Sequence, residues 1–156
     1  MVKRVPPKAT PPVTGRAAAR LAKHVEIALD HLGLSLPQYR VLIILEKGST
    51  AASTLASNLV VSPPSVTALV DGLVTRGFVE RVSVVGDRRR VEHVLTDRGR
   101  KALAEADAAV NCRLDDIAGY LPSGDRSKVV TGLRLWLKAM DAYVEARVRG
   151  RVASSR

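Results

Sequence analysis

Apolar residues recur at helical spacing along residues 63–76. An apolar stripe at i, i+3, i+4, i+7 and i+8 predicts an amphipathic helix whose buried side is formed by Val66, Leu69, Val70, Leu73 and Val74. Ser62 suits the N-cap, and Pro63 suits the first helical position because it lacks an amide that would have no partner there. Gly77 marks the end of this helix.

The opposite face of this helix carries small side chains. We expect Ser65, Ala68, Gly72 and Thr75 to be exposed there, with Thr67 and Asp71 at the flanks. A glycine inside a helix costs about 1 kcal/mol relative to alanine, so Gly72 indicates a close approach to another surface. The alternative is an ordinary amphipathic helix with a plain outer face.

A basic hairpin is predicted directly after the helix. Residues 78–83 alternate in polarity, residues 91–95 are rich in β-branched side chains, and Gly86 with Asp87 supplies a turn. Arginine side chains enter a narrow minor groove, while a helix fits the major groove. The arginines of residues 88–90 therefore favour a winged helix-turn-helix, although a charged tip of this kind can also be simply solvated.

Further helices are predicted at residues 16–32, 36–47, 51–59 and 97–119 and after Ser123, with Ser35, Thr50, Thr96 and Ser123 as N-caps. The helix at 51–59, the turn and the helix at 63–76 form the helix-turn-helix. We thus expect a mainly α fold with a small β-wing: a lobe at 34–96, a helical dimerisation region at 16–33 and 97–149, a disordered basic proline-rich arm at 1–15 and a flexible tail at 150–156.

Dimerisation is expected because the lobe is too small to cover the long helices. The last helix carries a wide apolar stripe, which a second copy of the chain would bury. The alternative is a monomer with an antiparallel helix pair. The stripe consists of Val129, Val130, Leu133, Trp136, Leu137, Met140, Tyr143, Val144 and Val148.

Composition favours an anionic partner. The 156 residues carry a net charge of +10, and such a balance is typical of nucleic-acid binding. The single cysteine excludes an intrachain disulfide, which fits a reducing cytoplasm. No apolar run is long enough for a membrane span, and the charged, proline-rich start is unlike a signal peptide. We therefore expect a cytoplasmic bacterial or archaeal protein that is nucleoid-associated when bound.

Catalytic motifs are absent from the sequence. There is no nucleophile elbow, P-loop, dinucleotide-binding motif or Cys/His cluster. We expect no enzyme activity, no cofactor and no metal. Cys112 is expected to be an inert, buried thiol, although the adjacent Arg113 would lower the pKa of a reactive one.

Residues 87–96 match the D-x-R-x-x-x-x-x-L-T wing signature of the MarR (multiple antibiotic resistance regulator) family, which the chain therefore resembles. The upstream register agrees at residues 55–56, at Thr67 and Leu73, and at residues 76–81. The resemblance implies a homodimeric regulator, more often a repressor, that binds pseudo-palindromic double-stranded DNA. It places the helix at 63–76 in the major groove and the wing at 84–90 in the minor groove.

The same resemblance implies the residues that contact DNA. Asp87 would orient Arg89 for the minor groove, and the full set is Ser53, Thr54, Ser62, Pro64, Ser65, Thr67, Ala68, Arg76, Asp87, Arg88, Arg89 and Arg90. Positions 68 and 72 are often basic in such regulators but are Ala68 and Gly72 here. DNA shape is thus expected to contribute to sequence choice. The alternative is a winged-helix module for protein interaction or non-specific nucleic-acid binding, without sequence readout.

The resemblance also implies a small aromatic or phenolic ligand between the dimer helices and the DNA-binding lobe, which would relieve repression. The candidate ligand-binding residues are His31, Tyr39 and Arg40, with Tyr120 or Trp136 as further possibilities. The alternative for each is core packing.

Overall fold

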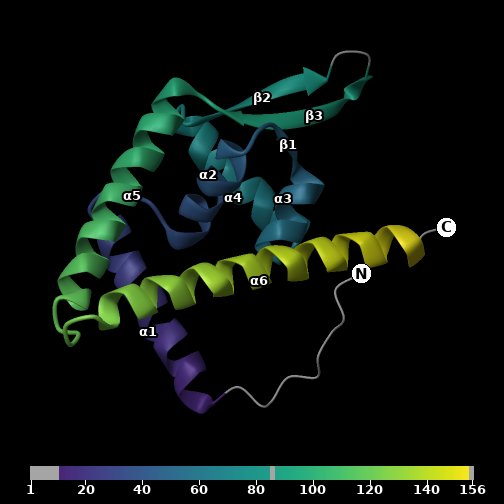
Figure 1. Cartoon of the computed structure of the whole chain (residues 1–156). Helices are drawn as coiled ribbons and strands as arrows, with labels where there is room; N and C mark the ends of the chain where they lie inside the picture. Colours follow the sequence, from purple (N-terminus) through teal and green to yellow (C-terminus); the bar gives the residue numbers. More distant parts are fainter. Residues whose placement is uncertain (1–10, 85–86, 155–156) are drawn as a thin grey trace.

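The computed structural model describes residues 11–84 and 87–154, without the side chains of residues 87–90 and 147–154. Figure 1 shows a helical lobe with a hairpin at one end and a long helix at the other. The elements are α1 (Pro12–Asp30), α2 (Leu36–Glu46), β1 (Thr50–Ala51), α3 (Ala52–Leu59), α4 (Pro63–Thr75), β2 (Val79–Val84), β3 (Asp87–Leu95), α5 (Asp97–Ala118) and α6 (Asp125–Ser154).

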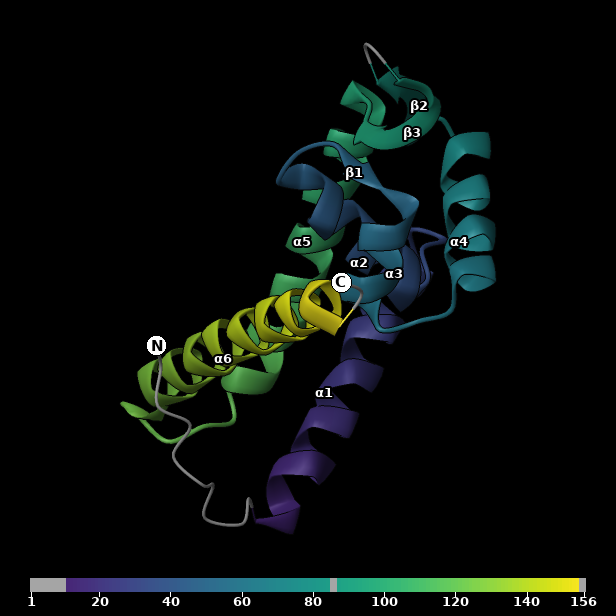
Figure 2. The same cartoon turned by 90° about the vertical axis from the view of Figure 1, so that its right-hand side faces the viewer.

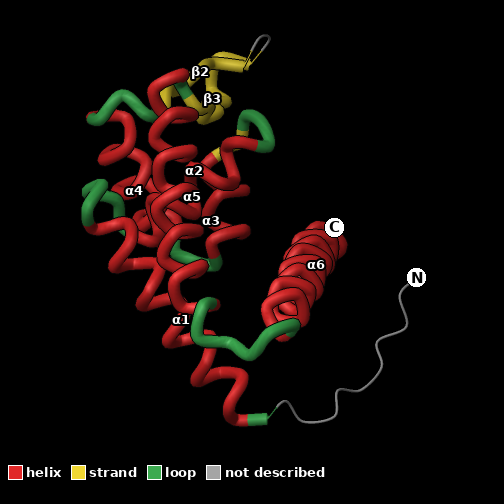
Figure 3. Tube along the Cα trace, turned by 60° about the vertical axis from the view of Figure 1, so that its left-hand side comes forward, coloured by secondary structure: helices red, strands yellow, loops and turns green. Residues whose placement is uncertain are grey.

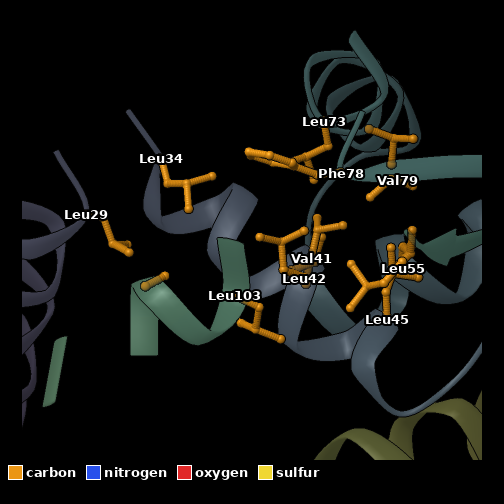
Figure 4. Close-up of a cluster of buried hydrophobic side chains, with 14 of the residues drawn as sticks. Leu29, Leu34, Val41, Leu42, Leu45, Leu55, Leu73, Phe78, Val79 and Leu103 are labelled. Carbon is orange, nitrogen blue, oxygen red and sulfur yellow. The ribbon is translucent and has the colours of Figure 1, made fainter. Parts of the chain in front are cut away.

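One hydrophobic core joins the lobe to the two helices that flank it. Side chains from α1, α2, α3, α4, β2 and α5 meet there, as Figure 4 shows for Leu29, Leu42, Leu55, Leu73, Val79 and Leu103. Leu29, Leu42, Leu55 and Leu73 are 0% exposed. Burial of each such side chain stabilises the fold by about 1.5–3 kcal/mol. The predicted apolar stripe of α4 is confirmed, because Val66, Val70 and Leu73 are buried.

The sheet is antiparallel, with strand order β1-β3-β2. Val79 pairs with Leu95, and Thr50 pairs with the buried His93, whose ring Nδ1 lies 3.1 Å from the Thr50 carbonyl oxygen. α5 starts directly after β3 and packs very closely on the start of the hairpin. A Cβ at Gly99 would lie 2.0 Å from the Phe78 carbonyl oxygen. Only glycine permits this approach, which fixes the hairpin relative to α5.

Local capping explains two of the helix starts. Ser35 and Gln38 form a capping box at the start of α2, and the Thr96 hydroxyl accepts from the Gly99 amide at the start of α5. Both N-caps were predicted. Thr50 was wrong as an N-cap, because it lies in β1 and Ala51 takes that position. Ser62 occupies the predicted N-cap position of α4, but its hydroxyl pairs with that of Ser65 at 2.8 Å.

The termini of the helical region differ from the prediction. α1 begins at Pro12, so residues 12–15 are helical and not part of a disordered arm, since a proline at N1 favours a helix start. α6 runs from Asp125 to Ser154, which replaces the expected flexible tail through residue 154. Ser123 precedes the cap position, because Gly124 with φ of 87° makes the turn into α6. Residues 1–10 lie outside the described residues.

α6 lies against little of the molecule. Figure 1 shows α6 passing along the end of the lobe opposite the hairpin, and Figure 3 shows it nearly end-on, beside the other helices. α1, by contrast, packs along α5. None of residues 125–146 is buried.

The turn between α3 and α4 is unusual, since Val60 adopts a left-handed conformation with φ of 59°. This conformation is rare for a β-branched residue.

Candidate nucleic-acid interface

α4 lies at the edge of the molecule and turns one face outward. Figure 2 shows it on the side of the lobe, with its C-terminal end close to the β2–β3 hairpin. The core holds the apolar stripe inward, so the exposed face consists of Pro63, Pro64, Ser65, Thr67, Ala68, Asp71 and Thr75. The side chains on this face are mostly short, which permits close approach to a second surface.

Gly72 does not belong to the exposed face, and this part of the prediction is wrong. It is half-buried against α2, where an added Cβ would lie 3.1 Å from Gln38 Nε2. Gln38 is itself held in place, because its Oε1 accepts from the Ser35 amide in the capping box. The close approach that Gly72 permits is therefore between α4 and α2.

The threonines of the exposed face use their hydroxyl protons within the helix. Thr67 donates to the Pro63 carbonyl oxygen at 3.3 Å, and Thr75 donates to the Asp71 carbonyl oxygen at 2.9 Å. Such back-bonding leaves each hydroxyl oxygen able to accept. Pro64 and Ala68 offer no side-chain donor. The face thus presents acceptors and methyl groups more than donors.

An ion pair connects α4 to the hairpin. The Arg81 guanidinium of β2 donates to the Asp71 carboxylate of α4. Both side chains stay accessible, at 42% exposed for Arg81 and 55% for Asp71. The sequence pattern placed Asp71 at the flank of the outer face without assigning it a partner. The alternation along residues 78–83 is the one signal that could have suggested Arg81.

Arg76 has an internal role that its prediction as a DNA contact did not include. Its guanidinium donates to the carbonyl oxygens of Gly33 at 2.7 Å and Leu32 at 3.0 Å, just after α1. It also lies 4.4 Å from the centre of the Phe78 ring. Arg76 therefore ties the end of α4 to the α1–α2 connection.

The remaining DNA-contact predictions divide into two groups. Ser53 and Thr54 are exposed at the start of α3, and Ser62, Pro64, Ser65, Thr67 and Ala68 are exposed at α4 and the turn before it. The backbone of residues 87–90 belongs to β3. The side chains of Asp87, Arg88, Arg89 and Arg90 lie outside the described residues, so their roles stay predictions.

The three candidate ligand-binding residues point to different neighbours. The Tyr39 hydroxyl donates to Asp107 of α5, and burial together with this carboxylate raises the pKa of Tyr39. Arg40 donates to the Leu59 carbonyl oxygen at 3.3 Å, at the end of α3. His31 is exposed at the C-cap of α1. Tyr120 and Trp136 are 93% and 52% exposed.

Cys112 is exposed on α5, so the expectation of a buried thiol is wrong. Its helix turns Ala106 and Val110 toward the core, which places residue 112 on the outer side.

Among the described residues, no cluster of three His, Cys, Asp or Glu side chains could hold a metal ion. No helix in the described part of the chain is long and apolar enough to cross a membrane.

Comparisons with known proteins agree on one family. The family model described as "MarR family" matches residues 34–91. The uncharacterized HTH-type transcriptional regulator YhbI of Bacillus subtilis is 35% identical over 60% of this chain and 62% of the relative. The HTH-type transcriptional repressor Mb2911 of Mycobacterium bovis is 33% identical over 61% and 69%. The chain thus spans about three-fifths of YhbI.

A solved structure extends the likeness to most of the chain. The crystal structure of the Mycobacterium tuberculosis MarR family protein Rv2887 in complex with salicylic acid matches with a TM-score of 0.68 and 26% identity. The match covers 83% of this chain and 98% of that one. The arrangement of helices outside the lobe is therefore shared as well.

Proposed function

The chain belongs to the MarR family of winged helix-turn-helix transcriptional regulators, and from that premise we propose that it is a homodimeric repressor of transcription. It binds pseudo-palindromic double-stranded DNA in the cytoplasm, on the nucleoid. The single observation that carries the proposal is the outward face of α4, which the core presents beside the β2–β3 hairpin. Each half-site receives α4 in the major groove and the hairpin tip in the adjacent minor groove.

Affinity comes mainly from phosphate contacts. The net charge of +10 favours association with DNA. Each phosphate that the protein neutralises makes the affinity fall more steeply as the salt concentration rises. Ser53 and Thr54 at the exposed start of α3 are placed to contact the backbone. Arg89 enters the minor groove, oriented by Asp87, while Arg88 and Arg90 add charge near phosphates. Arg76 supports α4 through its bonds to the carbonyl oxygens of Leu32 and Gly33.

A second copy of the chain covers α6. Five of its exposed apolar residues follow one another at intervals of four, three, four and three, a spacing typical of helix–helix packing. Their exposed fractions of 44–59% are large for one contiguous stripe, which supports an interface. The stripe is formed by Val129, Leu133, Trp136, Met140 and Tyr143. α1 and α5 complete the dimerisation region, and residues 34–96 form the DNA-binding lobe.

A small aromatic or phenolic anion relieves repression. The support is the relative whose structure holds salicylic acid. His31, Tyr39 and Arg40 are the candidates for this site. His31 ends α1, the Tyr39 hydroxyl bonds to Asp107 of the dimer helix α5, and Arg40 bonds to the end of α3. The two lobes of the dimer can stand at a spacing that fits DNA or at one that does not. A ligand that binds one of these two states more tightly changes the affinity for DNA by up to the difference between its two binding free energies.

Selection of bound fragments from the organism's own genome tests this function. The chain should enrich a few fragments with two-fold symmetric sites. Titration of one such fragment should then show that Arg89→Ala weakens binding by about 1–3 kcal/mol. Lys23→Ala is a control with equal loss of charge, since Lys23 pairs only with Glu26 on α1 among the described contacts. Wild-type affinity of Arg89→Ala would remove Arg89 from the mechanism.

A winged-helix module without sequence readout is the second candidate. The observation in its favour is the absence of any basic side chain from residues 63–75 of α4. Under this alternative, all fragments bind with similar affinity and salt displaces them equally. Enrichment of a defined site would exclude it.

A further inference from the structure

Asp71 is the one charged side chain within α4. It lies on the exposed face, in the third turn of the helix, at 55% exposed. A carboxylate on a surface that faces DNA is repelled by the phosphates unless it finds a donor in the groove. The position therefore either weakens binding to all sequences or selects for bases that supply such a donor.

Arg81 holds this carboxylate in a defined place. Its Nη2 donates to Asp71 Oδ1, so one carboxylate oxygen is engaged from the hairpin side. A carboxylate has about four lone-pair sites, which leaves Oδ2 able to accept from another donor. The arginine also offsets part of the negative charge. The pair is thus fixed, close to neutral and still able to accept.

The rest of the exposed face has few donors to offer. Thr67 and Thr75 donate to backbone carbonyl oxygens, the Ser65 hydroxyl pairs with that of Ser62, and Ala68 carries only a methyl group. In the major groove, guanine shows two acceptors, cytosine shows the N4 amino donor, and adenine shows a donor beside the N7 acceptor. Guanine would leave Asp71 without a donor. Adenine would place N7 near the carboxylate lone pairs, whereas cytosine presents a donor without an adjacent acceptor.

We propose that Asp71, positioned by Arg81, accepts a hydrogen bond from the N4 amino group of one cytosine in each half-site. Asp71 is then a specificity-determining residue of the recognition helix, and direct readout acts beside DNA shape. The inference rests on the proposed function, because it requires that α4 enters the major groove.

The test compares the sequences selected from a library of randomised half-sites by the wild type, Asp71→Asn and Asp71→Ala. The wild type should prefer cytosine at one position by about 5- to 150-fold over the other bases, the range for a good side-chain contact to a base. Asp71→Asn should change that preference to adenine, because an asparagine amide pairs with N6 and N7 of adenine. Asp71→Ala should lose selectivity at this position only.

Asp115→Asn is the matched control. Asp115 forms an exposed ion pair with Arg126, and the two side chains are 61% and 58% exposed, but they join α5 to α6 away from α4. This variant should select the same bases as the wild type. Far-ultraviolet circular dichroism checks that each variant is folded, and the isosteric Asp71→Asn carries the test if Asp71→Ala unfolds.

The outcomes separate this inference from the function on which it rests. A wild type that selects no sequence overturns both. A wild type that selects a defined site, with unchanged base preferences in both Asp71 variants, overturns the cytosine contact and leaves the regulator function standing. An equal increase in the affinity of Asp71→Ala for every sequence also overturns the cytosine contact, since the carboxylate would then only repel phosphates.

Discussion

Arg76→Ala tests whether the end of α4 is held from inside the lobe. The substitution removes two hydrogen bonds from the guanidinium, to the carbonyl oxygens of Leu32 and Gly33, and its contact with the Phe78 ring. The charge that it removes is the same whether Arg76 supports the fold or contacts phosphate. The two roles differ in what happens to the free energy of unfolding.

The magnitude follows from these contacts. A hydrogen bond from a charged donor contributes about 1.5–3 kcal/mol when buried. The bond to Leu32 is part-buried and the bond to Gly33 is exposed, so the second contributes less. The cation–π contact adds about 0.5–1 kcal/mol at an accessible site. We expect Arg76→Ala to lower the free energy of unfolding by about 2–4 kcal/mol.

Urea denaturation followed by circular dichroism measures this loss, at one fixed chain concentration because a dimer is concentration-dependent. Arg98→Ala is the matched control. Arg98 is exposed, and its guanidinium lies 5.5 Å from the same ring, so the loss there should stay below about 1 kcal/mol. Unchanged stability of Arg76→Ala, together with a smaller salt dependence of DNA binding, would refute the internal role.

Three further predictions concern the packing of single side chains. Gly99→Ala should destabilise the fold by more than about 3 kcal/mol in thermal or urea unfolding, because its Cβ would overlap the Phe78 carbonyl oxygen. Gly72→Ala should change stability by less than about 1 kcal/mol and leave DNA affinity unchanged. The higher helix propensity of alanine offsets the cost of a small shift of the Gln38 side chain. The raised pKa of Tyr39 means that the folded state keeps a proton that the unfolded chain loses. Stability should therefore decline as pH rises above about 10, and Tyr39→Phe should lack this part of the decline in urea titrations at pH 8–11.

A specific result would contradict each of these three predictions. Gly15→Ala, in open space on α1, should be neutral or slightly stabilising, and equal effects at Gly15 and Gly99 would contradict the close packing. Weaker DNA binding by Gly72→Ala would indicate that Gly72 lies on the face of α4 that contacts DNA. An identical alkaline decline in wild type and Tyr39→Phe would exclude Tyr39 as its source.

Local patterns predicted the elements of this fold well. The apolar stripe of α4 and the N-caps Ser35 and Thr96 depend on residues close in sequence, and the structure confirms them. The mainly α fold with a small β-wing, and the family likeness from the wing signature, are confirmed as well.

Contacts between distant segments were beyond the sequence pattern. Thr50 resembles an N-cap until it is known to pair with His93, which lies 43 residues later. Gly72 was given the wrong neighbour because helical periodicity places a residue on a face but does not say what that face meets. The partners of Arg76 and Asp71 likewise depend on where α1 ends and where β2 passes, which only the packed structure determines.

A hydroxyl-radical footprint on a genomic fragment that the chain selects shows whether two copies of α4 bind one face of the duplex. We expect two protected segments on one face of the duplex, centred about 34 Å apart, as two copies of α4 related by a two-fold axis would leave. One protected segment, or even protection along the whole fragment, would contradict it.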